Sequence, residues 1–355
     1  MDAAGVQLGS SLPVPCVQEL AKEHRDSVPE RYLRPDQDHP VVPDSALCYE
    51  VPVIDMDKLL FQDSMDSELA KLDFACKEWG FFQLINHGVD SFLVEKIKKE
   101  VQDFFNLPME EKKKFWQHPG EVQGFGQAFV VSEEQKLDWA DIFFVVSRPL
   151  NERKPHLFPK LPLPFRDSLE AYSMELENLT KKLVELMAKA LKMEMQEMEE
   201  LFNDGHLQYM RMNYYPPCAL SDKVIGLTPH SDAVGLTILL QVSEVDGLQI
   251  RKDGNWIPVK PLPGAFVINI GDVMEMITNG IYRSIEHRAT VDKNQERLSF
   301  ATFHTPAYKK EIGPAPSLVS EQRPALFRRI LAEDYFKGLF TRELKEKSYL
   351  DAMRI

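Results

Sequence analysis

The sequence predicts a mixed α and β fold in which helices flank an all-β region of the sandwich or barrel type. From Leu207 onward, apolar residues recur at every second position, as expected for half-buried strands. Turn signals such as Asp246-Gly247 and Asp253-Gly254 separate these short runs. Ahead of them, residues 165–203 carry apolar side chains at helical spacing, which predicts a long helix that supports the sheet.

Composition limits the classes of function. Of the 355 residues, 44% are hydrophobic and 27% are charged, as in an ordinary globular protein. The net charge of −13, without a basic stripe, argues against a nucleic-acid partner. No secretory signal and no run of eighteen apolar residues is visible, so we expect no membrane span, a cytoplasmic location and, by default, a monomer. The cysteines are scattered without zinc spacing, which fits a reducing compartment: Cys16, Cys48, Cys76 and Cys218.

The chain divides into four stretches. Residues 1–50, rich in proline and polar side chains, are expected to form an N-terminal arm that packs over the body. Residues 51–204 form an N-terminal α/β region that ends in the long supporting helix. Residues 205–306 hold the all-β domain, and residues 307–355 form a C-terminal helical segment with its main helix at about 325–340.

Strands and helices alternate in the predicted N-terminal region. Residues 51–55 and 81–86 are short apolar runs that predict buried strands. Ser67 is a candidate N-cap for a helix that runs to Trp79, where Gly80 follows. A second helix is expected over about 91–106.

Two short motifs in the all-β region have the order of a metal site. His230 and Asp232 lie two residues apart, and His287 follows at a distance. Side chains two apart on a strand share a face, so His230 and Asp232 can reach one ion. Two histidines and one carboxylate in this order are typical of the facial triad that holds Fe(II) on one side and leaves the other side open. Taken singly, each residue also fits an ordinary polar position on a strand.

A basic residue and a hydroxyl follow the second histidine. The guanidinium of Arg297 can pair bidentately with a carboxylate, and the Ser299 hydroxyl can add one hydrogen bond. An inward-facing Arg297 would be expensive to bury without an anionic partner, so these residues indicate a carboxylate-bearing co-substrate. Alternation places Phe303 on the same face of this strand, where it should border the pocket.

An earlier strand offers further hydrogen-bond donors. By the same alternation Arg211, Asn213 and Tyr215 share one face. The amide of Asn213 and the phenol of Tyr215 could therefore donate to a second carboxylate.

At these residues the sequence resembles the plant-type 2-oxoglutarate- and Fe(II)-dependent dioxygenases, over nearly the whole chain. Within that family it is most similar to the benzylisoquinoline O-demethylases and senescence-related dioxygenases. The motifs that carry the resemblance are 51–55, 78–82, 86–89, 213–218, 230–232, 279–280, Ser284, 287–288 and 297–299, and the finer likeness rests on 124–127, 137–141 and 348–351.

The resemblance implies a double-stranded β-helix (jelly-roll) core flanked by helices. It implies that His230, Asp232 and His287 ligate Fe(II). It also implies that Arg297 and Ser299 hold the distal carboxylate of 2-oxoglutarate. Tyr215 and Asn213 are expected to assist. Dioxygen would be the second co-substrate, and ascorbate is expected to help activity.

A small aromatic substrate is expected beside the metal. Hydroxylation or O-demethylation of a plant specialised metabolite, with release of succinate and CO2, is the reaction that the family implies. The expected substrate wall consists of Phe125, Phe129, Val131, Phe303, Phe336 and Phe340. Two alternatives remain open at this point: an Fe(II) oxidase of the same fold that does not use 2-oxoglutarate, and a receptor that binds a small molecule in the barrel.

Overall fold

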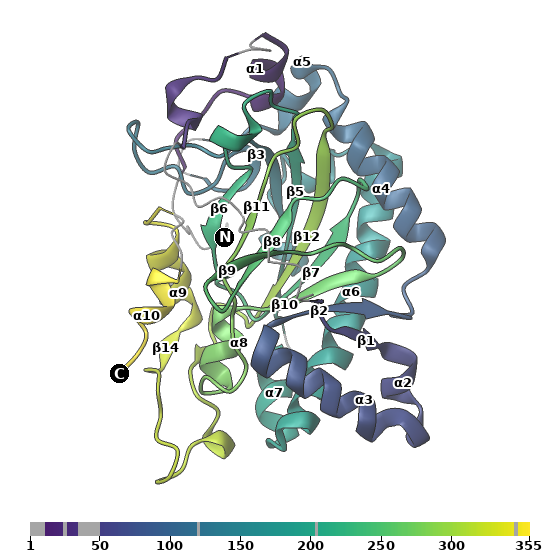
Figure 1. Ribbon diagram of the computed structural model, residues 1–355, viewed down its shortest axis with the longest axis vertical. Coiled ribbons are helices and arrows are strands. Elements are labelled where there is room, and N and C mark those ends of the chain that lie inside the picture. Colours follow the sequence, from purple (N-terminus) through teal and green to yellow (C-terminus); the bar gives the residue numbers. More distant parts are fainter. Residues whose placement is uncertain (1–10, 24–26, 35–49, 119–120, 203–204, 344–346) are drawn as a thin grey trace.

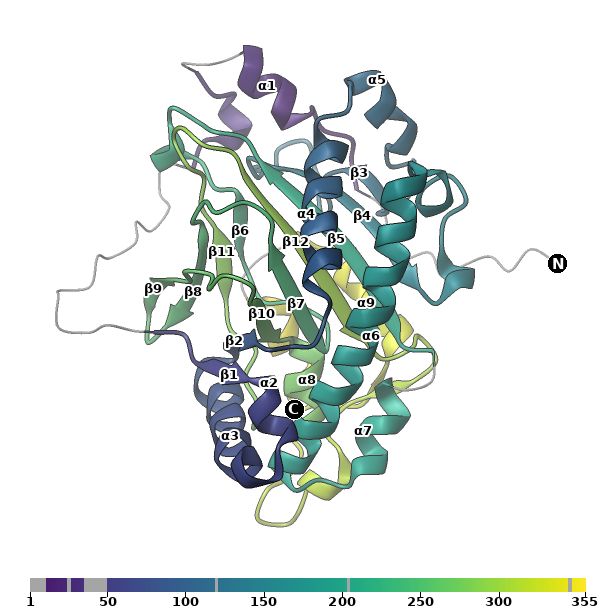
Figure 2. The ribbon, with the colours of Figure 1, turned by 90° about the vertical axis from the view of Figure 1, so that its right-hand side faces the viewer.

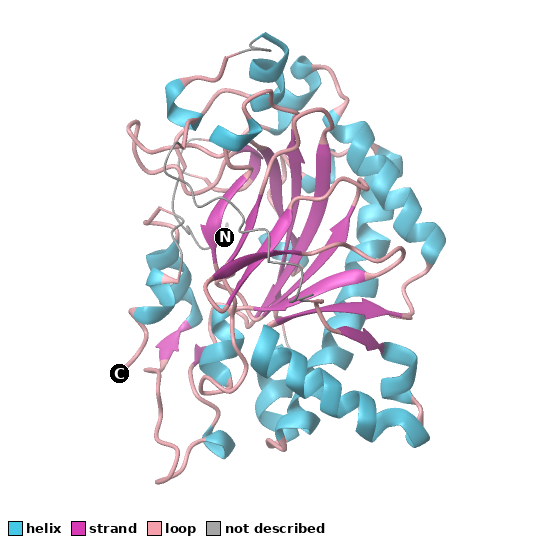
Figure 3. Cartoon of the chain, in the orientation of Figure 1, coloured by secondary structure: helices cyan, strands magenta, loops and turns pink. Residues whose placement is uncertain are grey.

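Two facing β-sheets form the core of the molecule, and helices surround them (Figures 1 and 3). The structure is a computed structural model that describes residues 11–23, 27–34, 50–118, 121–202, 205–343 and 347–355. The larger sheet has eight strands in the order β1 (Val53–Asp55), β2 (Phe81–Ile85), β10 (Phe266–Ile270), β7 (Leu236–Gln241), β12 (Arg297–Thr305), β5 (Leu207–Tyr215), β4 (Asp141–Arg148) and β3 (Gly124–Gly126). The smaller sheet has the order β6 (Leu227–His230), β11 (His287–Ala289), β8 (Leu248–Lys252) and β9 (Asn255–Pro258).

Helices α4 (Ser91–Phe105) and α6 (Leu163–Leu191) lie side by side along the outer face of the larger sheet (Figure 2). Their contacts follow the alternation of the strands. Phe143 of β4 points outward to Phe104, with ring centroids 4.7 Å apart, and Phe300 of β12 stacks on Tyr172 of α6 at 5.5 Å. The neighbouring residues of β4 and β12 therefore point inward, toward the space between the sheets.

The remaining helices lie at the ends of the sheets and along one side (Figure 1). They are α1 (Val17–Glu23), α2 (Met56–Leu60), α3 (Gln62–Phe74), α5 (Met109–Lys112), α7 (Met195–Phe202), α8 (Asp272–Ile277), α9 (Ala332–Leu339) and α10 (Ser348–Asp351). None of the helices in the described ranges is both long enough and apolar enough to cross a membrane.

The expected helix over 165–203 is two helices. α6 ends at Leu191 because Lys192 adopts a left-handed conformation with φ of 54°, and α7 begins at Met195. Apolar spacing continues across the break, so periodicity alone could not reveal it.

The helix expected from Ser67 begins five residues earlier, at Gln62, and Ser67 is not its cap. It continues through a π-helical turn (Ala75–Trp79) and stops at Gly80, whose φ is 61°. A Cβ at Gly80 would lie 2.2 Å from the Arg283 carbonyl oxygen, so glycine is required there for both conformation and space.

The C-terminal segment is less helical than expected. The helix predicted over 325–340 is confined to α9, and the chain just before it forms β14 (Ile330–Leu331), which pairs with β13 (Glu311–Ile312). Backbone pairing with a distant strand has overridden local preference here. Parts of the predicted N-terminal arm, including Cys48, lie outside the described residues.

Candidate active site

Three buried side chains converge between the two sheets. His230 ends β6, His287 begins β11, and the two are direct cross-strand partners in the smaller sheet. Asp232 follows β6 by two residues, and its Oδ1 lies 3.4 Å from His230 Nε2 and 3.6 Å from His287 Nε2. One ligand atom from each residue lies within 4.8 Å of the others, which is the spacing of a metal-binding cluster.

Hydrogen bonds orient both imidazoles. His230 Nδ1 lies 2.8 Å from the Thr228 carbonyl oxygen, and His287 Nδ1 lies 3.2 Å from that of Ile285. A carbonyl accepts only from an N–H, so each Nδ1 carries the proton and each Nε2 presents its lone pair. Both lone pairs face Asp232 Oδ1. The donor set therefore suits a divalent ion such as Fe(II).

The second oxygen of Asp232 is held from the larger sheet. Oδ2 accepts hydrogen bonds from the Thr237 hydroxyl at 2.6 Å and from the Asn269 amide at 2.8 Å. Burial alone would raise the pKa of Asp232, but the two imidazoles and Thr237 outweigh it and hold that pKa well below the usual range. Burial lowers the pKa of His287 to about 4 despite the nearby carboxylate. At neutral pH the cluster thus offers one carboxylate and a neutral His287.

Strand register assembles the predicted carboxylate site. β12 and β5 pair so that Arg297 lies opposite Tyr215 and Ser299 lies opposite Asn213. The Asn213 amide donates to Ser299 Oγ at 3.2 Å, and the Arg297 guanidinium carbon lies 5.2 Å from the Tyr215 ring centroid. All four residues line the cavity that also contains His230, Asp232 and His287.

Arg297 is a buried cation with donor capacity to spare. Its Nη2 donates to Gln241 Oε1 at 2.9 Å, but its Nε is buried without a hydrogen-bond partner. Burial lowers the pKa of Arg297, with no carboxylate of the described residues at ion-pair distance. An anion in this cavity would satisfy the guanidinium, and the residues present therefore fit 2-oxoglutarate.

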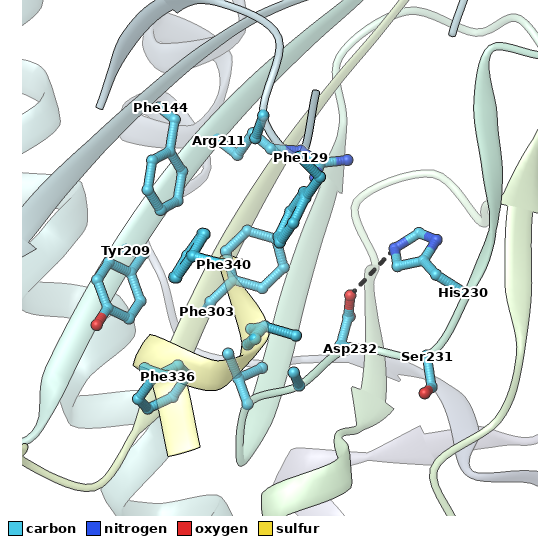
Figure 4. Close-up of a pocket in the computed structure, with 14 residues that line it drawn as sticks. Phe129, Phe144, Tyr209, Arg211, His230, Ser231, Asp232, Phe303, Phe336 and Phe340 are labelled. Atoms are coloured by element: carbon cyan, nitrogen blue, oxygen red, sulfur yellow. Dashed lines mark ion pairs between the residues drawn. The ribbon is translucent and has the colours of Figure 1, made fainter. Parts of the chain in front are cut away.

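A second, largely aromatic cavity opens beside the metal cluster (Figure 4). The empty space within the cavity and its open mouth is about 630 Å³. His230 and Asp232 line one side of it. The other lining residues are Ala128, Phe129, Phe144, Tyr209, Arg211, Ser231, Ala233, Val234, Phe303, Phe336, Leu339 and Phe340.

Four of the six expected wall residues line this cavity: Phe129, Phe303, Phe336 and Phe340. Phe129 and Phe340 stack face to face, with centroids 5.1 Å apart. The placement of the other two was wrong. Phe125 is buried on the helical side of the sheet, 6.2 Å from the Phe105 ring, because β3 pairs with β4 and turns that ring outward. Val131 lies on the surface, 38% exposed.

Known proteins resemble this chain along its whole length. Residues 207–306 match the family model of the 2OG-Fe(II) oxygenase superfamily, and residues 51–161 match that of the non-haem dioxygenase in morphine synthesis N-terminal region. Protein SRG1 of Arabidopsis thaliana is 61% identical, with 100% of both chains covered. The chain belongs to the 2-oxoglutarate- and Fe(II)-dependent oxygenase superfamily.

Relatives of this oxygenase include O-demethylases. The oxoglutarate-dependent flavonoid 7-O-demethylase 1 of Ocimum basilicum is 56% identical, with 98% of this chain and 93% of the relative covered. Codeine O-demethylase of Papaver somniferum is 52% identical, with 99% of this chain and 98% of the relative covered. The solved structure of JOX2 in complex with 2OG, Fe and JA superposes with a TM-score of 0.87 at 32% identity, covering 97% of this chain and 98% of that one.

These findings confirm several predictions for the oxygenase. It is an oxidoreductase of the 2-oxoglutarate-dependent dioxygenase type, with a jelly-roll core flanked by helices. Its cofactor is Fe(II) and its co-substrate is 2-oxoglutarate. The predicted likeness to senescence-related and benzylisoquinoline O-demethylating dioxygenases is also confirmed.

Sequence reasoning missed the residues that support the site. Thr237 on β7 and Asn269 on β10 both donate hydrogen bonds to Asp232. The two residues are direct cross-strand partners, and no short sequence motif predicts that pairing. In the sequence, Gly247 is only part of a turn signal. A Cβ there would lie 2.7 Å from Arg297 Cδ, so this glycine leaves room for the guanidinium stem.

Proposed function

We propose that His230, Asp232 and His287 ligate Fe(II) through Nε2, Oδ1 and Nε2. These three atoms converge on one point, and a hydrogen bond to the other polar atom of each side chain orients it. Both observations support the assignment. Arg297 and Ser299 would bind the distal carboxylate of 2-oxoglutarate, with Tyr215 and Asn213 beside them. The buried, partnerless Arg297 Nε supports this second assignment.

We propose further that the enzyme oxidises a flat, mostly apolar aromatic molecule at an O-methyl carbon. The observation that carries this proposal is the aromatic cavity, which shares His230 and Asp232 with the metal site. The stacked Phe129 and Phe340 rings offer a surface for a planar substrate. The O-demethylases among the relatives favour a methoxyl carbon as the point of attack.

In this proposal the protein positions the reactants. Bound Fe(II), with 2-oxoglutarate and dioxygen, supplies the oxidising chemistry. The cavity wall would hold the substrate methyl group next to His230 and Asp232, while Arg297 fixes the co-substrate. Hydroxylation of the methyl carbon gives a hemiacetal, which breaks its C–O bond to release formaldehyde and a phenol. 2-Oxoglutarate leaves as succinate and CO2, so the two oxygen atoms of dioxygen are accounted for.

Product analysis tests this proposal. Purified enzyme with Fe(II) and 2-oxoglutarate would be screened against methoxylated aromatics, with succinate and formaldehyde measured together. Equal amounts of both products are expected. Formation of succinate and a hydroxylated ring without formaldehyde would show that the enzyme hydroxylates its substrate and does not demethylate it. Oxidation of the substrate without succinate would indicate an oxidase that does not use 2-oxoglutarate.

A further inference from the structure

Arg211 brings a positive charge into the aromatic cavity. It lies in the middle of β5, between Phe144 of β4 and Ala301 of β12, and it is 8% exposed. Its side chain reaches into the cavity beside Phe129 (Figure 4). It also lines the cavity of the metal and carboxylate sites, so it stands where the two spaces meet.

Only one edge of this guanidinium is engaged. Nε donates to Asn213 Oδ1 at 2.7 Å, and Asn213 in turn donates to Ser299. The guanidinium carbon lies 5.9 Å from the Phe303 ring centroid. Among the described residues, no carboxylate lies at ion-pair distance from Arg211, and its two terminal nitrogens have no hydrogen bond within the protein.

Arg211 also borders a third cavity, which Asp138 lines, and the carboxylates around all three cavities are already occupied. Asp232 is held by two imidazoles, Thr237 and Asn269. Asp138 accepts from the Thr228 hydroxyl at 2.6 Å and from Arg34 at 3.3 Å. Neither is free to neutralise Arg211.

A buried cation with unused donors is unfavourable unless a ligand completes it. The two terminal nitrogens of arginine match an oxyanion, and a charge-assisted hydrogen bond in a largely apolar cavity is strong. We propose that Arg211 binds an oxyanion of the substrate, a phenolate or a carboxylate, while the apolar part lies among the phenylalanines. This inference rests on the proposed function and specifies its substrate class. A cationic amine of the same size would be repelled.

Binding without turnover tests this proposal. The probes are methoxynaphthalene and derivatives that carry a carboxylate, a phenol or an aminomethyl cation on the far ring. Dissociation constants would be measured without oxygen, with Fe(II) and 2-oxoglutarate present. For the wild-type enzyme we expect the carboxylate or phenol probe to bind more tightly than methoxynaphthalene, and the cation to bind most weakly. Equal or tighter binding of the cation would overturn the proposal without any variant.

A substitution series locates the effect. Arg211→Gln should weaken binding of the anionic probe roughly ten- to hundredfold and abolish the preference among probes, with 2-oxoglutarate affinity unchanged. Arg211→Lys keeps the positive charge but loses the two parallel N–H donors of the guanidinium, so it should retain part of the preference for anionic probes. The control Arg251→Gln removes a half-exposed arginine that pairs with Glu286 outside the cavities, and it should change nothing.

Two outcomes would contradict the assignment to Arg211. One is a preference for anions that survives in Arg211→Gln. The other is a loss of 2-oxoglutarate affinity in that variant as large as the loss for the probe, which would make Arg211 part of the co-substrate site. Formaldehyde release is measured separately, so intact probe selectivity without formaldehyde would reject demethylation alone.

Discussion

At the scale of single residues, each charged group of the site is fixed by a neutral neighbour. Thr237 and Asn269 hold one oxygen of Asp232, and Gln241 holds one nitrogen of Arg297. Such bonds leave the other polar atom of each group directed into the cavity. Neutral partners orient the charges without cancelling them, which keeps the charges available to an ion or a co-substrate.

Replacing Arg297 by leucine should weaken 2-oxoglutarate binding by about 2–5 kcal/mol, because the anion loses its buried partner. Thermal stability without co-substrate should not fall, since leucine removes a buried guanidinium whose Nε has no partner. Titration of 2-oxoglutarate and thermal unfolding would measure the two effects. Unchanged 2-oxoglutarate affinity would contradict the carboxylate assignment.

At the scale of elements, strand pairing brings residues far apart in sequence to one site. β6 and β11 place His230 opposite His287, and β5 and β12 place Tyr215 opposite Arg297. The N-terminal arm contributes to the wall of the aromatic cavity through hydrogen bonds to the segment 127–130. Ser11 Oγ donates to the Gln127 carbonyl oxygen at 2.6 Å, and Leu12 N donates to that of Val130 at 2.8 Å. These bonds hold the segment that carries Phe129.

The carboxylate of Asp141 anchors that arm. It accepts from the backbone nitrogens of Val17 and Gln18, both at 2.8 Å, and so caps α1 from the start of β4. Asp141→Ala should lower the free energy of unfolding by about 1–3 kcal/mol, because two buried N–H groups lose their acceptor. It should also raise the KM for the aromatic substrate and leave that for 2-oxoglutarate unchanged.

Equilibrium unfolding and steady-state kinetics would measure these effects. Glu19→Ala is the matched control, since Glu19 lies on the same helix and its one ion pair within the described part of the chain is with Lys22, three residues along. A rise in the KM for 2-oxoglutarate in Asp141→Ala would show that the arm supports the jelly-roll site and not the substrate wall.

At the scale of the whole molecule, the proposed metal and carboxylate sites lie within the jelly roll, and the proposed substrate wall draws on segments outside it. The wall combines β4, β5 and β12 with Phe129 from a loop and Phe336 and Phe340 from the C-terminal segment. This division explains how one core can serve different substrates, because the wall can change while the metal site stays.

The same division explains what the sequence could predict. Period-two alternation placed Arg297, Ser299 and Phe303 on one face, and the structure agrees because β12 has no bulge along its pairing with β5. The same reasoning gave no direction for Phe125 or Val131, which lie in a short strand and a loop. Thr237 and Asn269 could not be predicted, since their role depends on the register of two strands that are distant in sequence.

A pH dependence of stability follows from two buried histidines at the end of the sheet. His304 Nδ1 lies 3.4 Å from His206 Nε2, and burial lowers the pKa of both below 6.5. The unfolded chain therefore binds more protons below about pH 6.5, so stability should fall as the pH drops through that value.

Replacing His304 by glutamine should reduce the pH slope of the unfolding free energy by up to about 1.4 kcal/mol per pH unit between about pH 6 and 5. Denaturant unfolding at several pH values would measure that slope. A slope in His304→Gln equal to that of the wild type would show that the buried pair does not control acid stability.

The most direct test of the central claim is the anaerobic binding of Fe(II) to the wild-type chain and to Asp232→Ala, measured by equilibrium dialysis. We expect one ion per wild-type chain, and an affinity lower by at least about tenfold in the variant, because Oδ1 is the ligand atom that lies nearest to both imidazoles. Equal Fe(II) affinity in the two proteins would show that Asp232 is not a ligand of the iron.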